Sequence, residues 1–277
     1  MTYKTILLHV NDERRVVGLV EAAAVLATRY EAHLIGLYVM PPVPTYGVTS
    51  VGAGMIKAGL GTFRDEAKRV HAAFEQATKG RPFVTEWRVV EARNGGVAET
   101  IMDHGRVCDL IIASQRDRDW DFSMLLDEPE RLAIESGRPV LIVPHKGKFS
   151  NFGRRITVAW NGTREAARAT FDALPLLKDA DNVRVLWINP QDDADAGDLP
   201  TAEIAATLAR HGVKCEGRML LADDAKVSDV LRADMEADGS DLLVMGAYGH
   251  SRLRQFVFGG ATREMLRHMT LPVLMSH

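Results

Sequence analysis

Residues 154–177, "RRITVAWNGTREAARATFDALPLL", join a short β-type run, a polar turn and an Ala-rich helical pattern. Residues 4–27, "KTILLHVNDERRVVGLVEAAAVLA", follow the same order. Two further pairs match along the chain: "DLIIAS" at 109–114 with "DLLVMG" at 241–246, and "RPVLIVPH" at 138–145 with "LPVLMSH" at 271–277. Because self-similarity at this scale indicates a duplicated unit, the chain is predicted to contain one fold twice.

Within each half, β-branched runs alternate with helical stretches, which is typical of βαβ units around a parallel sheet. We therefore predict an α/β fold with two tandem, doubly wound domains, each with a five-stranded parallel sheet flanked by helices. The predicted strands are 4–10, 33–39, 83–91, 109–114 and 138–144 in the first half, and 155–160, 182–188, 214–221, 241–246 and 271–276 in the second.

The length of 277 residues accommodates two domains of ordinary size. We predict domains at 1–146 and 154–277, joined by a linker at 145–155, "HKGKFSNFGRR", which lacks helical or strand periodicity. Residues 41–61, "PPVPTYGVTSVGAGMIKAGLG", have no counterpart in the second half. Their prolines and glycines predict an irregular segment, either a surface loop or a lid or partner contact.

Composition limits the classes of partner. With a net charge of -3, the chain has no strong field to attract nucleic acid or a membrane surface. No apolar run approaches the roughly 20 residues of a bilayer span, and the apolar run at the start is too short for a signal peptide, so a cytoplasmic location is expected. Cys108 and Cys215 stand alone, which predicts neither a zinc site nor a disulfide.

The loop after the fourth strand of the second half is rich in glycine. It contains Gly246, Gly249, Gly259 and Gly260, and Thr262 then opens a helix. Ligands of open α/β sheets bind beyond the carboxyl ends of strands, where the strand order reverses. Glycines allow close approach of the backbone, and a helix N-terminus offers free N–H groups to an anion. The loop suits a phosphate, although by itself it could equally serve to turn the chain.

The spacing Gly, two residues, Gly, nine residues, Gly, followed by "LPVLM", resembles the nucleotide-binding motif of the universal stress protein family, and the doubled chain resembles its tandem type. The resemblance implies that ATP or AMP, with Mg²⁺ accompanying ATP, lies between the first and fourth strands of the second half. It also implies that the closing strands of the halves pair, so that one chain forms an intramolecular pseudo-dimer. The implied phosphate contacts are Gly246, Gly249, Gly259, Gly260, Ala261 and Thr262; the adenosine end would face Ala159, Trp160, Asn161, Ile188 and Met245.

Two positions depart from the family pattern. Asn161 stands where the family usually has Asp; its amide oxygen can accept from ribose but carries no charge. Gly260 stands where Ser or Thr is preferred, which leaves Thr262 as the nearest hydroxyl. The matching loop of the first half, from Ser114, has no glycine and carries carboxylates where phosphate would lie, so this half is predicted to have lost the site. The acidic residues are Asp117, Asp119, Asp121, Asp127 and Glu128.

No Walker lysine and no general base follow the glycines, so no catalytic residue is predicted. Ser251, in "GHSRL", lacks the second glycine of a nucleophile elbow and is interpreted as a loop hydroxyl. No histidine pair has metal-ligand spacing, and no metal site is predicted. Two functions remain: a nucleotide-binding stress regulator, or an interaction module of the same fold that binds no nucleotide. The protein partner and further homodimerisation are left open.

Overall fold

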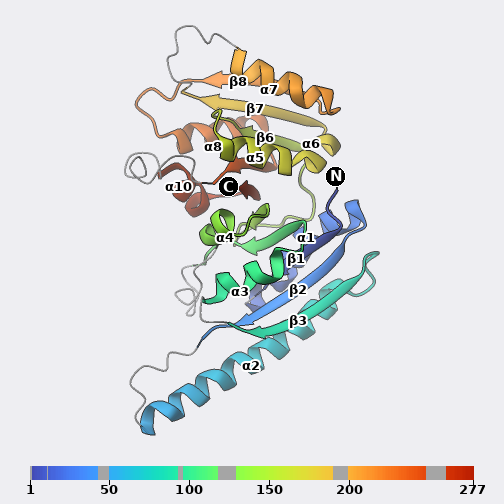
Figure 1. Ribbon diagram of the computed structural model, residues 1–277, viewed down its shortest axis with the longest axis vertical. Helices are drawn as coiled ribbons and strands as arrows, with labels where there is room; N and C mark the ends of the chain where they lie inside the picture. The colour runs from blue at the N-terminus through green and yellow to red at the C-terminus, as the bar shows by residue number, and fades with distance from the viewer. Residues whose placement is uncertain are drawn as a thin grey trace. The chain divides into compact units, whose positions relative to one another are not determined.

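The computed structural model describes residues 2–10, 12–42, 50–92, 96–117, 129–189, 199–247 and 260–277 (Figure 1). By internal contacts the chain divides into two compact units. The N-terminal unit consists of Tyr3–Arg138 with His145–Ser150, and the C-terminal unit consists chiefly of Pro139–Pro144 with Asn151–His277. Among the described residues, no helix has the length and apolar character needed to cross a membrane.

The N-terminal unit contains four parallel strands in the order β3-β2-β1-β4. The strands agree with the predicted ranges to within two residues. Its elements are β1 (Thr5–His9), the 3₁₀ helix η1 (Glu13–Arg15), α1 (Val16–Tyr30), β2 (His33–Met40), α2 (Ser50–Thr78), β3 (Thr85–Glu91), α3 (Gly96–Gly105), β4 (Leu110–Ser114) and α4 (Glu130–Glu135).

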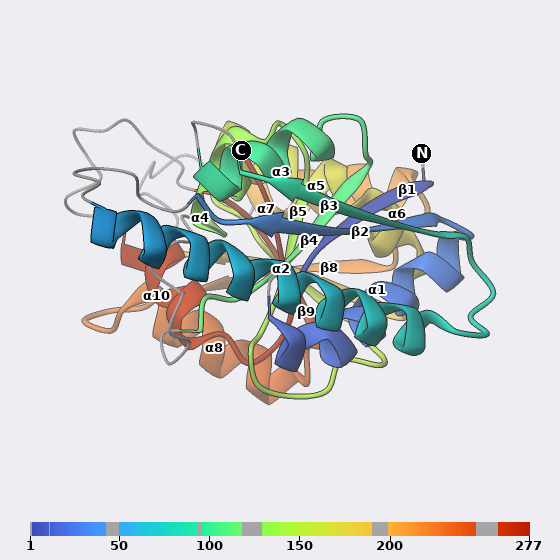
Figure 2. The ribbon, with the colours of Figure 1, turned by 90° about the horizontal axis from the view of Figure 1, so that it is seen from below.

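Helices cover both faces of this sheet. α1 packs along α2 on one face, and α3 packs with α4 on the other (Figure 2). The core between the layers is aliphatic: β1 and β4 are almost fully buried, and α1 contributes a nearly continuous buried stripe of alanine, valine and leucine. Strands buried on both faces explain the uninterrupted apolar runs in the sequence.

The prediction that residues 41–61 are irregular is wrong from Ser50 onward. These residues begin α2, a helix that continues to Thr78 and includes four glycines in its first half. The later part of α2 is anchored on the sheet through Phe63, Val70 and Phe74. Once this anchored part is helical, adding further residues to its N-terminal end costs little nucleation entropy, so the glycines are tolerated. Residues 43–49 lie outside the described part of the chain.

The C-terminal unit has six strands in the order β5-β10-β9-β6-β7-β8. Five of them are parallel, and β5 pairs antiparallel with β10, which confirms that the two closing strands pair. Its elements are β5 (Val140–Val143), β6 (Arg155–Ala159), α5 (Arg164–Asp172), α6 (Leu174–Asp179), β7 (Asn182–Ile188), α7 (Leu199–Arg210), β8 (Cys215–Leu220), α8 (Val227–Asp238), β9 (Leu242–Gly246), α10 (Gly260–His268) and β10 (Val273–Ser276).

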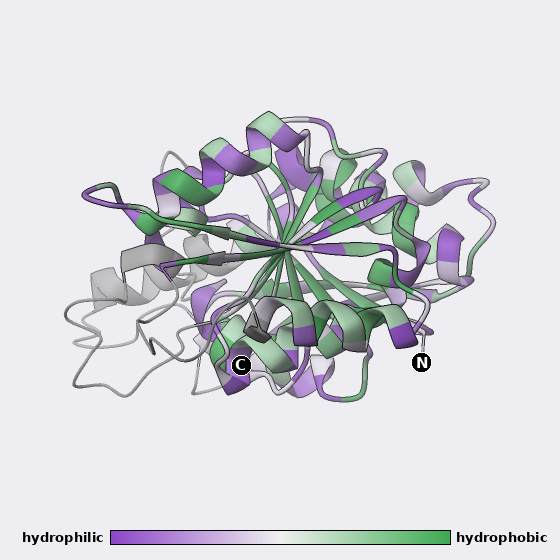
Figure 3. Ribbon diagram, turned by 90° about the horizontal axis from the view of Figure 1, so that it is seen from above, coloured by the Kyte–Doolittle hydropathy of each residue, from purple (hydrophilic) through white to green (hydrophobic). Residues whose placement is uncertain are grey.

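In this unit α5, α6 and α7 lie on one face of the sheet, and α8 and α10 lie on the other (Figure 2). The central strands are hydrophobic along most of their length, while polar residues mark the outward sides of the helices (Figure 3). β6, β9 and β10 form the apolar centre of the sheet, so the carboxyl ends of β6 and β9 emerge from a rigid support.

An aspartate before the fourth strand makes equivalent hydrogen bonds in each half of the chain. In the N-terminal unit the Asp109 carboxylate accepts from the backbone N–H groups of Lys4 (2.7 Å) and Thr5 (2.9 Å). In the C-terminal unit the Asp241 carboxylate accepts from N–H groups just before and at the start of β6, including those of Gly153 (2.9 Å) and Arg155 (3.1 Å). Each half therefore uses the aspartate before its fourth strand to fix the start of its first strand.

Candidate functional site

The carboxyl ends of β6, β7 and β9 bring together side chains that are distant in sequence. Ala159, the last residue of β6, is the register partner of Met245 in β9 and of Leu186 in β7. β6 is the first strand of the second sequence repeat and β9 is its fourth, so the strand order reverses between them, which is where doubly wound sheets bind ligands. Ile188 ends β7, two residues beyond Leu186.

Gly246 allows the start of α5 to approach the end of β9. A Cβ atom at Gly246 would stand 2.6 Å from the carbonyl carbon of Glu165 and 2.7 Å from the amide nitrogen of Ala166. Both are backbone atoms and cannot rotate away. The absence of a side chain at Gly246 thus sets the distance between the β6–α5 connection and β9.

The β6–α5 connection is a turn with its own hydrogen bonds. Asn161 Oδ1 accepts from the hydroxyl of Thr163 (2.8 Å) and from its N–H (3.3 Å). The Thr163 hydroxyl in turn caps α5 by accepting from the N–H of Ala166 (3.3 Å). Gly162 has φ of +70°, in the left-handed region that favours glycine. The amide oxygen of Asn161 is therefore already used within the turn.

Glu165 is a buried carboxylate in the first turn of α5. Burial acts to raise its pKa, but hydrogen bonds from Arg164 and the Thr163 side chain outweigh this effect, and the pKa lies below its ordinary value. The Arg164 guanidinium forms an ion pair with Glu165 and is itself largely exposed. The Glu165 carboxylate is therefore ionised at neutral pH, and the exposed Arg164 guanidinium partly neutralises its charge.

The end of β9 is also held by the last strand. The Ala247 N–H donates to the Ser276 carbonyl (2.8 Å), and the His277 ring nitrogen Nδ1 lies 2.7 Å from the Ala247 carbonyl oxygen. These contacts fix the backbone at the point where it leaves the sheet.

The phosphate-loop residues are only partly within the described structure. Gly249, Gly259 and Ser251 lie outside the described residues. Gly260 and Ala261 open α10, and Thr262 follows in the first turn with its side chain buried. Among the described residues, no group of three His, Cys, Asp or Glu side chains is arranged to hold a metal ion.

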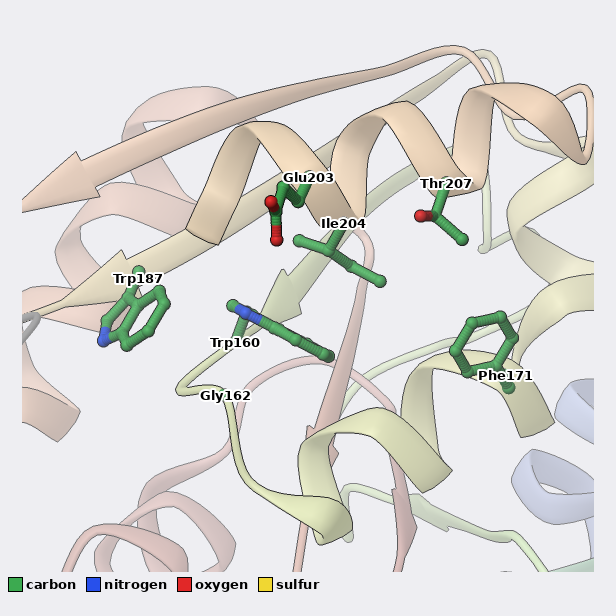
Figure 4. A pocket seen from close by; sticks show the side chains of 7 residues that line it. All are labelled: Trp160, Gly162, Phe171, Trp187, Glu203, Ile204 and Thr207. Atoms are coloured by element: carbon green, nitrogen blue, oxygen red, sulfur yellow. The ribbon is translucent and has the colours of Figure 1, made fainter. Parts of the chain in front are cut away.

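A groove of about 320 Å³ opens beside this site, between α5 and α7 (Figure 4). Trp160 lies in its centre, Trp187 at one end and Phe171 at the other, and Glu203 projects from α7 into the groove. Of the residues that line the groove, only Trp160 was among the predicted site residues. Trp187 could have been predicted as well. It lies near the end of β7, which pairs in parallel with β6, and the ends of parallel strands lie at the same edge of a sheet. The lining residues are Trp160, Gly162, Phe171, Trp187, Glu203, Ile204 and Thr207.

The matching region of the N-terminal unit is closed by side chains. Arg15 extends from the start of α1 to Ser114 Oγ at the end of β4 (3.2 Å) and to the His145 carbonyl oxygen (2.5 Å). Burial lowers the pKa of Arg15, and the nearby Asp12 and Asp117 charges oppose that shift. Gln115 Oε1 accepts from the His145 N–H (3.0 Å). Hydrogen-bonded side chains thus occupy the space between the ends of β1 and β4. Of the five acidic residues predicted there, only Asp117 lies within the described part of the chain.

Comparison with known proteins supports the fold and the family. Residues 153–277 match the model of the universal stress protein family. The chain is 28% identical over 176 residues to the universal stress protein Slr1230 of Synechocystis sp. (strain ATCC 27184 / PCC 6803 / Kazusa). That match covers 60% of this chain and 57% of the relative, which is less than two thirds of the relative's length.

Two solved structures match nearly the whole chain. The structure of a universal stress protein from Archaeoglobus fulgidus DSM 4304 has a TM-score of 0.69 at 14% identity, covering 99% of this chain and 96% of its own. The structure of PA1789 from Pseudomonas aeruginosa PAO1, described as functionally unknown, has a TM-score of 0.61 at 14% identity, covering 99% and 92%. At these identities the likeness shows a shared fold over both halves.

Proposed function

From the match of residues 153–277 to the universal stress protein family, we propose that the chain is a stress-response regulator that binds ATP or AMP in its C-terminal unit. The protein acts in the cytoplasm by changing its contacts with a protein partner, and the nucleotide controls that change. The N-terminal unit, with Arg15 across its strand ends, serves as a structural or regulatory companion.

The observation that carries this proposal is the convergence of the proposed adenosine contacts at the strand reversal. Ala159 and Met245 are register partners, and Trp160 and Asn161 follow directly on β6. Ile188 ends the neighbouring strand β7. The sequence pattern alone predicts these residues. Their common position at one sheet edge supports a single adenosine site.

Within this site, Asn161 acts as a donor. Its Oδ1 accepts twice from Thr163, so the ribose hydroxyl oxygens receive hydrogen bonds from its NH₂ group. A family aspartate would accept from the same hydroxyls. Asn161 can thus still contact the ribose, as a donor where an aspartate would accept. It also places no negative charge near the phosphates.

The phosphates are held by backbone N–H groups at the start of α10. The first residues of a helix have N–H groups without intrahelical partners, and these suit an anion. Gly260 and Ala261 supply them, together with Gly246, Gly249 and Gly259 from the preceding loop. The Thr262 side chain is buried, so the backbone rather than a hydroxyl makes the principal contact there. Mg²⁺ is bound through the phosphates of ATP.

The proposal is tested on purified protein by mass spectrometry of released ligand and by calorimetric titration with ATP and AMP. We expect the protein to carry or bind an adenine nucleotide and Gly249→Val to weaken binding by at least tenfold, since a valine side chain blocks close approach of the backbone. Gly18→Val is the control, because a side chain at Gly18 meets no atom within 4 Å.

Two results would overturn the proposal. If no nucleotide is released and none binds at about millimolar concentration, the chain is an interaction module of the same fold. If Gly249→Val binds as tightly as the native chain while remaining folded, the phosphates are not held by the glycine loop.

A further inference from the structure

The groove between α5 and α7 has a lining that the nucleotide proposal does not use. Three aromatic side chains face it, Trp160, Trp187 and Phe171, and Ile204 adds an aliphatic wall (Figure 4). Its volume of about 320 Å³ lies within the range of small-molecule sites. Phe171 is 43% exposed, so part of its ring is open to a ligand at the end of the groove.

The same positions are closed in the N-terminal unit. β2 residue Leu37 pairs with His9, and β7 residue Leu186 pairs with Ala159, so Tyr38 and Trp187 follow at equivalent places. Tyr38 is 1% exposed. Its hydroxyl donates to Glu66 on α2 (3.4 Å), and α1 packs along α2 above it.

In the C-terminal unit this closure is missing. α5 ends at Asp172, and α6 begins at Leu174 with a proline in its first turn. Among the described residues, α7 shows no packing along α5 comparable to that of α2 along α1. A Cβ at Gly162 would stand only 3.3 Å from the Trp187 ring, so glycine leaves room for the indole at the groove. The groove is therefore a feature of this unit and not of the fold.

The charge at the tryptophan end of the groove is negative. Glu203 is the one formally charged side chain among the described residues that line it, and its side chain projects toward Trp160 (Figure 4). No other described residue forms a hydrogen bond or ion pair with its carboxylate. Two basic groups lie toward the other end: Arg210 reaches Thr207 Oγ1 (3.5 Å), and the His211 ring meets Phe171 edge-on (6.1 Å). Arg164, two residues after Gly162, is paired with Glu165.

We infer that this groove binds a small organic cation, a quaternary or alkylated ammonium group, against Trp160 and Trp187 with Glu203 as its counter-ion. Aromatic faces attract a cation electrostatically, and indole is the strongest of the natural rings. Alkyl groups on the nitrogen gain from contact with Ile204 and the ring faces, whereas an anionic ligand is repelled by Glu203. The groove shares Trp160 with the proposed nucleotide site, but its other walls are formed by α5, α7 and the end of β7. The inference therefore does not depend on nucleotide binding.

The test uses choline as the probe and 3,3-dimethylbutan-1-ol as its neutral counterpart of the same shape. Nitrogen-15 spectra report the indole N–H of each of the four tryptophans, assigned with single Trp→Phe variants. We expect choline to shift the Trp160 and Trp187 signals with a Kd on the order of a millimolar, and not Trp87, which stacks on His71 in the other unit. The neutral alcohol is expected to bind at least fivefold more weakly.

Two matched variants test the role of charge. Glu203→Gln keeps the shape and removes the charge, and we expect about fivefold weaker binding of choline. Glu236→Gln, at an exposed position on α8 on the opposite face, should leave the Kd unchanged. Trp187→Leu should weaken binding by about fivefold or more while the other indole signals keep their native positions.

The inference fails if the neutral alcohol binds as well as choline, if Glu203→Gln has no effect, or if the responding indoles are not those of Trp160 and Trp187. Nucleotide binding is measured on the same samples. Glu203→Gln should leave the affinity for AMP unchanged and Gly249→Val should leave the affinity for choline unchanged, so the failure of either proposal is recognised separately.

Discussion

At the scale of single residues, Gly246 shows how one position serves two requirements. Its place in the glycine pattern predicted close approach of a phosphate, and this remains a proposal. The structure adds a packing reason, since backbone atoms of Glu165 and Ala166 occupy the space that a side chain would need. The glycine is therefore required by the contact between α5 and β9 even without a ligand.

We expect Gly246→Ala to lower the free energy of unfolding by about 2 kcal/mol, because the added methyl group meets backbone that cannot move without shifting α5. Gly18→Ala is the opposite case. A methyl group there meets nothing within 4 Å, and the site is inside α1, so stability should rise by about 0.5–1 kcal/mol. Urea unfolding of the two variants measures both values. Equal effects at the two positions would contradict the packing role of Gly246.

Asn161 and the groove residues mark the limit of sequence reasoning about the site. The sequence showed that an amide replaces a carboxylate at Asn161, but not that its oxygen is taken by Thr163, because that depends on the conformation of the turn. Trp160 was identified from the strand end that carries it. Phe171 and Glu203 were not, since their position at the groove depends on the absence of packing between α5 and α7.

At the scale of elements, the strands followed from the sequence and α2 did not. Runs such as β1 and β4 are buried on both faces, so their composition alone indicates a strand. The first half of α2 has a composition that favours a loop, and contacts made further along the helix decide its structure. Local propensity was overridden by packing that a sequence pattern does not show.

The contact between β2 and α2 should make stability depend on pH. Burial, and then the negative charge of Asp12, raise the pKa of Glu66, although Arg69 and the Tyr38 hydrogen bond oppose the shift. The pKa in the folded state is thus above that in the unfolded state, so the folded state binds more protons between the two values. The stability that protonated Glu66 contributes is complete below the pKa of the unfolded state, and it is lost as the pH rises through the pKa of the folded state.

We therefore expect Glu66→Gln, which stays neutral and can still accept from Tyr38, to be more stable than the native chain at pH 7. The difference should close as the pH falls below about 4, where Glu66 is protonated in both states. Free energies of unfolding measured from pH 3.5 to pH 8 test this. Asp65→Asn, at an exposed position on the same helix whose ion-pair partner is Lys68, is the control and should show no such trend. A difference that does not change with pH would contradict the argument.

At the scale of the whole molecule, the internal repeat and the packing divide the chain differently. The repeat places residues 138–144 at the end of the first domain, and the predicted boundary at 146 keeps them there. By contacts, Pro139–Pro144 belong to the C-terminal unit, where β5 pairs with β10. The pairing of closing strands followed from the family resemblance, but the assignment of β5 to one unit depends on long-range contacts that a repeat does not encode.

This difference can be tested with two fragments, 139–277 and 151–277. In the shorter fragment β10 loses its antiparallel partner, so the backbone groups of Val273–Met275 that pair with Val140–Ile142 are left open beside an apolar strand. Such an edge favours association with another chain. We expect 151–277 to unfold at a lower urea concentration than 139–277 and to self-associate more strongly by light scattering, because it also lacks the partner of β10. If both fragments are monomeric with the same unfolding midpoint, β5 contributes nothing to the C-terminal unit, and the boundary indicated by the repeat describes the folding unit better than the contacts do.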